Sequence, residues 1–176
     1  MTEETKSTEE ALIPDTYPLA TRMSRLVAFI IDELITSLIV VPFFLLDPEF
    51  VAQFKQAGQF SAEDQFSLVI SQIVVYLVIN SYFLKRSGQS IGKRIMGIAI
   101  VNYKDGQLIS LSKIINYRYL PFWLIGVASL FSLQLGVLGF ILHFIGLLDK
   151  IYIFRPEQRC LHDYTAGTKV INVKRT

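Results

Sequence analysis

The chain has 176 residues, of which 52% are hydrophobic, and its mean hydropathy is +0.43. This composition is too apolar for an ordinary soluble domain, so one membrane domain is expected. A single cysteine, Cys160, excludes an internal disulfide. The formal net charge is only +2, so the placement of the charges is more informative than their sum.

An acidic, polar tail over residues 1–19 opens the chain, and we expect it to be disordered. It lacks the basic start and apolar core of a cleaved signal peptide, so the first span is expected to act as an uncleaved signal. From Leu26 to Leu46 the chain is apolar over the ~20 residues that a helix needs to cross a bilayer. Asp32 and Glu33 are the only charges in this stretch.

A carboxylate in the middle of a span costs about 2.5–3.5 kcal/mol, so Asp32 is expected to face protein or a wet cavity. Arg25 and Asp32 share one helix face, about 10.5 Å apart along the axis, and each therefore needs partners from other helices. Glu33 lies about 100° further round. Either these charges form a structural network that fixes helix packing, or they form an ion or ligand site. The full predicted face comprises Arg22, Arg25, Phe29, Asp32 and Thr36.

A second, uncharged span is predicted from Phe66 to Leu84. Within it, Gln72, Tyr76 and Asn80 follow one another four residues apart and so share one face. Polar side chains inside membranes usually hydrogen-bond between helices. We therefore expect this face to be the neighbour of Asp32, where it either joins helices or contacts a ligand.

The two predicted loops on either side of this span differ in charge. Residues 47–65 carry four acids and one base, whereas residues 85–118 carry seven bases and one acid. Cytoplasmic loops are enriched in Lys and Arg, so the basic stretch is expected inside and the acidic loop outside. Lys93 and Arg94 are expected to contact anionic lipid headgroups.

The basic stretch also has a strand pattern. Residues 95–103 are rich in β-formers, Asp105-Gly106 is a turn signal, and residues 107–110 offer a return strand. The sequence thus predicts a small cytoplasmic β-hairpin-like loop between the second and third spans.

Residues 119–154 are too many for one span and enough for two joined by a tight turn. We therefore predict an all-α membrane protein with four transmembrane helices and both termini in the cytoplasm. His143 lies in the fourth span, with Asp149 near the same face. Because histidine titrates near neutrality, His143 either joins Asp32 and Glu33 in a proton route or simply bonds a neighbouring helix.

Four patterns in order then carry a family resemblance. They are Arg25-x2-Ala28-x3-Asp32, the run Gly88-Gln89-Ser90-Ile91-Gly92-Lys93-Arg94-Ile95-Met96-Gly97, the turn Asp105-Gly106, and Leu161-His162-Asp163-x3-Gly167-Thr168-x-Val170. Together they resemble the RDD family of bacterial membrane proteins over residues 20–173, which leaves residues 174–176 as a short tail. The resemblance implies a multi-pass protein of the inner cell membrane, with a suggested role in ion or proton transport.

The family is named for one arginine and two aspartates. Arg25 and Asp32 match the first two, and Asp163 is the expected second aspartate, with Asp149 as the alternative. Asp163 is expected to cap or pair at the cytoplasmic side, within reach of Arg22 or Arg25 if the C-terminal segment folds back.

Other chemistries fit the sequence poorly. A Walker A loop has four residues between its glycines and a Ser or Thr after the Lys, whereas three residues separate Gly88 from Gly92 and Arg94 follows Lys93. His162 and Asp163 lack further ligands at metal-site spacing. We expect no enzyme activity, no metal, no cofactor and no nucleic-acid partner.

Two functions remain open. In the first, the chain is a small transporter or exchanger in which Asp32 and Glu33 bind an ion or proton, Arg25 tunes their charge and Asp163 gates the cytoplasmic side. Four spans are few to enclose a pathway, so this function predicts a homo-oligomer. In the second, the chain is a non-transporting adaptor or assembly factor, its charge network is structural, and its basic regions bind anionic lipid or another membrane protein.

Overall fold

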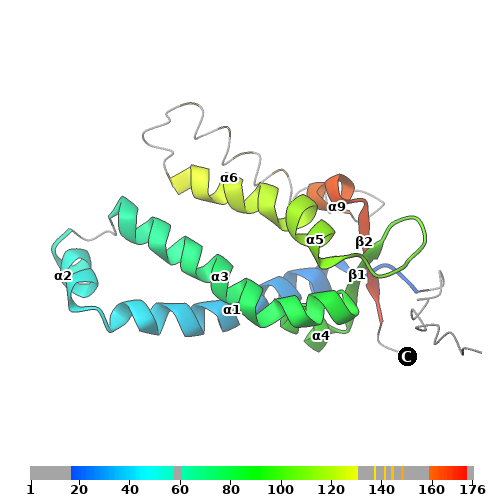
Figure 1. The fold of residues 1–176 in the computed structure, drawn as a ribbon, viewed down its shortest axis with the longest axis horizontal. Helices are drawn as coiled ribbons and strands as arrows, with labels where there is room; N and C mark the ends of the chain where they lie inside the picture. The colour runs from blue at the N-terminus through cyan, green and yellow to red at the C-terminus, as the bar shows by residue number, and fades with distance from the viewer. Residues whose placement is uncertain are drawn as a thin grey trace, which may run out of the picture.

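A computed structural model of the chain describes residues 17–57, 61–130 and 159–173, with the single positions 137, 141, 144 and 148. The described part is mostly helical, with a two-stranded sheet at one end (Figure 1). The elements are α1 (Arg22–Leu45), α2 (Pro48–Ala57), α3 (Ala62–Ser87), α4 (Ile91–Met96), β1 (Ile98–Asn102), α5 (Leu111–Lys113), the π-helix η1 (Ile114–Tyr119), α6 (Leu120–Leu130), α9 (Leu161–Ala166) and β2 (Thr168–Asn172).

Two helices, α1 and α3, are long and apolar enough to cross a membrane. Their 24 and 26 residues extend about 36 and 39 Å, longer than the ~30 Å hydrocarbon core of a bilayer. They pack against each other, and their outer faces expose large apolar side chains such as Leu38 at 73% and Val78 at 75%. Such faces suit lipid better than water.

The four-span arrangement stays a prediction. Of residues 119–154, the structure describes α6 and four single helical positions, so the predicted turn and most of the predicted fourth span lie outside the described residues. His143 and Asp149 are among the positions that are not described.

Local sequence accounts for the ends of both long helices. The side chain of Thr21 accepts a hydrogen bond from the Ser24 N–H at 3.1 Å and so caps α1, and Ser61 caps α3 through the Asp64 N–H. At its other end α3 stops at Gly88, which adopts the left-handed conformation that favours glycine.

The sheet differs from the predicted hairpin. β1 pairs antiparallel with β2, so that Ile100 lies opposite Val170, and residues 107–110 form no strand. The predicted turn is present, because the Gly106 N–H donates to the Asn102 carbonyl at 3.1 Å. The return strand comes from the far end of the sequence because β1 is buried on both faces. It therefore needs a partner that is apolar on both faces, and β2 supplies adjacent buried residues at Val170 and Ile171.

A further segment extends this sheet at β2. Leu19 forms a β-bridge with Ile171, and the Asn172 N–H donates to the Pro18 carbonyl at 2.9 Å. The last residues of the predicted tail, 1–19, thus make ordered contacts, while residues 1–16 lie outside the described part. The sheet therefore joins the approach to α1 to the C-terminal strand.

The main core lies where the sheet meets the N-terminal part of α1, the C-terminal part of α3 and the start of η1. Its buried members are Ala20, Ala28, Leu84, Ile98, Ile100, Ile109, Ile114 and Val170. This core fixes the elements that carry the buried charges described next.

Candidate functional site

The first buried charge is Asp32, which is 4% exposed and faces the N-terminal turn of α4. Its Oδ1 accepts a hydrogen bond from the Gly92 N–H at 2.7 Å, and its Oδ2 accepts one from the Ser90 hydroxyl. The Lys93 Nζ lies 3.8 Å from Oδ2. A carboxylate on α1 therefore caps a short helix that lies 58 or more residues further along the chain.

Glycine makes this contact possible. A Cβ added at Gly92 would lie 2.1 Å from the Ala28 carbonyl oxygen, so α4 packs directly on the backbone of α1. A Cβ at Gly88, where φ is +65°, would lie 2.3 Å from the Ile100 carbonyl oxygen. Gly88 and Gly92 thus serve close packing between backbones.

The polar face of α3 joins helices, but its described hydrogen bonds go elsewhere than to Asp32. Asn80 Oδ1 accepts the Ile91 N–H at 2.8 Å, so α3 also holds the start of α4. Gln72 donates to Ser37 of α1 at 3.5 Å, and the Tyr76 hydroxyl donates to the Tyr119 hydroxyl at 3.2 Å.

This face is predicted to neighbour Asp32, and Tyr76 lies close enough for the charge of Asp32 to act on its phenol, but the hydrogen bonds described for Asp32 come from Ser90 and Gly92. The first-turn N–H groups of α4 have no acceptor within their own helix. Together with the charged Lys93, they bind the Asp32 carboxylate more strongly than the neutral side chains of α3 would.

The predicted polar face of α1 also needs correction. Its buried residues are spaced by four: Ala28, Asp32, Thr36 and Val40. Phe29 is 49% exposed, and Arg22 and Glu33 are exposed as well. Because α4 and α3 cover only one side of α1, residues one position after the buried stripe, such as Phe29 and Glu33, face outward.

The second buried charge is Asp163, in the first turn of α9. It forms an ion pair with Arg118, accepts a hydrogen bond from the Thr168 hydroxyl at 2.8 Å, and accepts the Cys160 N–H at 3.2 Å. Arg25 Nη1 lies 3.6 Å from Asp163 Oδ2. The C-terminal segment thus folds back on the start of α1.

Burial by itself would raise the pKa of Asp163, but the charges of Arg118, His162 and Arg25 and the Thr168 hydrogen bond lower it to about 2. For Arg118, burial is the largest single effect and lowers the pKa, but Asp163, Tyr119 and Cys160 together more than offset it, so the pKa of Arg118 is raised. Both groups are therefore charged at neutral pH.

Arg118 was not among the predicted site residues, and it comes from the π-helix η1. The Leu120 N–H donates to the Ile115 carbonyl, five residues back, which is the π-helical pattern. Over this segment Arg118 reaches Asp163 while its neighbour Tyr119 reaches Tyr76. Short π-helical segments occur frequently at functional sites. In the sequence, Arg118 is simply the last base of a basic stretch.

Arg159 is a second arginine that sequence reasoning missed. Its guanidinium lies 4.0 Å from the Tyr103 ring centroid and 4.1 Å from that of Tyr164. It also donates to the Thr168 and Asp163 carbonyl oxygens, each at 3.1 Å. The side chain is buried and holds α9 against the loop after β1.

Of the two residues predicted to contact headgroups, only Arg94 faces outward. Lys93 turns toward Asp32, and its Nζ also lies 3.3 Å from the Ser90 hydroxyl. Arg94 is exposed and lies over the Phe83 ring at 5.2 Å.

The residues around Asp163 are poorly suited to bind a metal ion. The ligand atoms of Cys160, His162 and Asp163 lie within 4.8 Å of one another. However, the Asp163 oxygens already accept hydrogen bonds and face the guanidinium groups of Arg118 and Arg25. Two cations beside the carboxylate disfavour a third.

In a comparison with known families, residues 19–167 match the model of the RDD family. No curated protein and no solved structure matches the chain.

Proposed function

The chain belongs to the RDD family, and from the contacts of its buried charges we propose that these charges anchor a surface subdomain to its membrane-spanning helices. The surface subdomain consists of α4, β1, η1, α9 and β2. Family membership and the two apolar helices make the chain a membrane protein. Under this proposal it is a non-transporting adaptor or assembly factor.

One observation carries the proposal: each buried carboxylate connects α1 to the surface subdomain. Asp32 extends from α1 to α4, and Asp163 of α9 lies against Arg25 of α1. Arg25 also donates to the Val170 carbonyl of β2 at 3.1 Å. Hydrogen bonds to charged groups contribute about 1.5–3 kcal/mol each, and these form only while the subdomain sits on α1.

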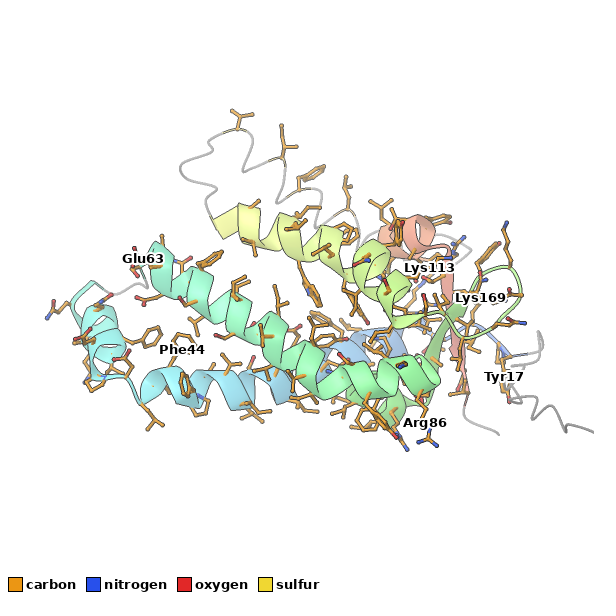
Figure 2. All side chains as sticks on the ribbon, in the orientation of Figure 1. Tyr17, Phe44, Glu63, Arg86, Lys113 and Lys169 are labelled. Atoms are coloured by element: carbon orange, nitrogen blue, oxygen red, sulfur yellow. The ribbon has the colours of Figure 1, made fainter. Side chains whose placement is uncertain are left out.

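The charge distribution supports an orientation. Figure 2 places Glu63 at the end of the molecule opposite to Arg86, Lys113 and Lys169. By the positive-inside rule we propose that the surface subdomain lies in the cytoplasm, with the chain in the inner cell membrane and both termini cytoplasmic. Its exposed bases then face anionic lipid or a membrane-protein partner.

The test is Asp32→Asn in the purified full chain. The expected result is a lower unfolding temperature and faster amide hydrogen exchange over residues 88–97, because the amide side chain lacks the charge that holds α4. Glu63→Gln removes a carboxylate from the exposed start of α3 and serves as the control. A variant Asp32→Asn with wild-type stability and wild-type exchange would refute the anchoring role.

A second candidate, ion or proton exchange, is favoured by one specific observation. The Tyr76 hydroxyl donates to the Tyr119 hydroxyl, and the charges of Asp32 and Arg118 act on both phenols. A pair of exchangeable hydroxyl protons within the fields of two buried charges suits proton movement. In this function Asp32 and Glu33 bind the ion or proton, and a homo-oligomer encloses the pathway.

Proteoliposomes separate the two functions. Exchange requires that Asp32→Asn and Tyr119→Phe reduce proton or cation flux while the protein stays folded, and that the reconstituted particle has the mass of an oligomer. Anchoring alone requires that wild type and both variants show the same background flux, and that a defined membrane-protein partner co-purifies with wild type.

A further inference from the structure

At the end of α3, four side chains form a continuous series on the outside of the molecule. Arg86 Nη1 donates to the Tyr82 hydroxyl at 2.7 Å, and the Tyr82 and Phe83 ring centroids are 5.5 Å apart. The Arg94 guanidinium from α4 lies 5.2 Å from the Phe83 centroid. Both guanidinium groups thus contact one pair of neighbouring aromatic rings. Figure 2 shows Arg86 projecting from this end of α3.

The positive charge here is not neutralised by the described residues. Arg86 and Arg94 are both exposed, and neither has a described carboxylate within ion-pair distance. The sequence contains no Asp or Glu from residue 65 to residue 104. The counter-charge for Arg86 and Arg94 is therefore expected from an anion that the described residues do not supply.

Apolar surface adjoins the two arginines. Tyr82 is 61% exposed and Ile95 is 55% exposed. Tyr82 lies one turn before Arg86 in a helix long and apolar enough to span a membrane, so it falls where tyrosines gather at the lipid–water interface. The patch thus combines cations with surface that suits acyl chains.

We propose that Arg86 and Arg94 bind the phosphate of an anionic phospholipid in the adjacent leaflet, with its acyl chains along Tyr82 and Ile95. Planar guanidinium groups suit phosphate because each can donate two parallel hydrogen bonds. The exposed apolar side chains favour a lipid over a soluble phosphate. The site rests on the proposed function, since it requires α3 to cross the membrane and Asp32 to hold α4, and hence Arg94, in place.

Native mass spectrometry of the full chain in detergent tests the site, with phosphatidylglycerol and phosphatidylcholine as probes. Wild type is expected to retain phosphatidylglycerol in preference to phosphatidylcholine, and Arg86→Gln/Arg94→Gln is expected to lower that preference by about 30-fold. Lys104→Gln/Lys113→Gln removes two exposed bases elsewhere on the same end and should keep the preference. Inorganic phosphate at millimolar concentration should not displace the lipid.

Four results would overturn the inference: no preference in wild type, an unchanged preference in Arg86→Gln/Arg94→Gln, an equal loss in both double variants, or displacement by inorganic phosphate. The last would indicate a site for a free anion. If Arg86→Gln/Arg94→Gln does not fold, Arg94→Lys answers the question, because a point charge should retain only part of the preference. Loss of stability with unchanged lipid preference would mean that Arg86 only complements the C-terminus of α3.

The two proposals can fail separately. If lipid preference is absent but Asp32→Asn still destabilises the chain and speeds exchange over residues 88–97, only the lipid site is lost. If Asp32→Asn has no effect, the anchoring function is lost whatever the lipid result.

Discussion

Arg118 and Asp163 are 45 residues apart in the sequence and form a buried ion pair that joins η1 to α9. Thr168 closes the arrangement, because its hydroxyl accepts from Arg118 at 2.6 Å and donates to Asp163 at 2.8 Å. Arg25 adds the contact with α1. Four segments of the chain thus meet at one carboxylate, so its removal should affect all four.

Removing the carboxylate should therefore be costly. Asp163→Ala leaves Arg118 buried without its counter-charge, and breaking such a pair costs about 3–5 kcal/mol. Denaturant unfolding in detergent micelles measures the loss, and Lys113→Gln, an exposed base nearby in sequence, is the control. A loss below about 1 kcal/mol would contradict the view that this pair holds the subdomain together.

Acid should destabilise the chain through the same group. Asp163 has a pKa of about 2 in the folded chain, below its ordinary value of 3.8. Because the unfolded chain binds this proton at higher pH, the stabilisation is complete above about pH 5. It is lost as the pH falls from about 4 to about 2. Unfolding temperatures of wild type and Asp163→Asn across this range measure the effect, and the variant should lack this component.

Gly92→Ala tests the approach of α4 to α1. The added Cβ would lie 2.1 Å from the Ala28 carbonyl oxygen, so α4 must move and lose its hydrogen bond to Asp32. We expect a destabilisation of about 2–4 kcal/mol. Gly126→Ala in α6 is the matched control, since its Cβ meets nothing within 4 Å, and alanine favours a helix by up to about 1 kcal/mol. Equal effects of the two substitutions would argue against close backbone packing.

Arg159→Lys tests the two-ring contact around Arg159. Lysine keeps the charge but loses the planar stacking on Tyr103 and Tyr164 and the paired hydrogen bonds to carbonyl oxygens. The expected cost is about 1–3 kcal/mol in unfolding free energy, with increased protease cleavage near α9. Wild-type protease resistance would mean that charge alone suffices at this position.

Local information was sufficient for some features of the chain. The apolar stretches that became α1 and α3 follow from hydropathy summed over neighbouring residues, and the caps at Thr21 and Ser61 involve residues within three positions. The turn at Asp105-Gly106 is likewise local. The high free-energy cost of a carboxylate in hydrocarbon also indicated that Asp32 faces protein and not lipid.

Which groups meet was decided only by tertiary structure. Spacing gives the direction in which Asp32 points but not which groups bind it, and its hydrogen bonds come from Ser90 and Gly92 at the start of α4 rather than from α3. β1 takes a partner from the far end of the chain, because burial of both its faces outweighs the shorter loop to residues 107–110. Arg118 and Arg159 resemble solvated bases in the sequence. Their burial depends on a carboxylate, carbonyl oxygens and tyrosine rings that come together only when distant segments pack.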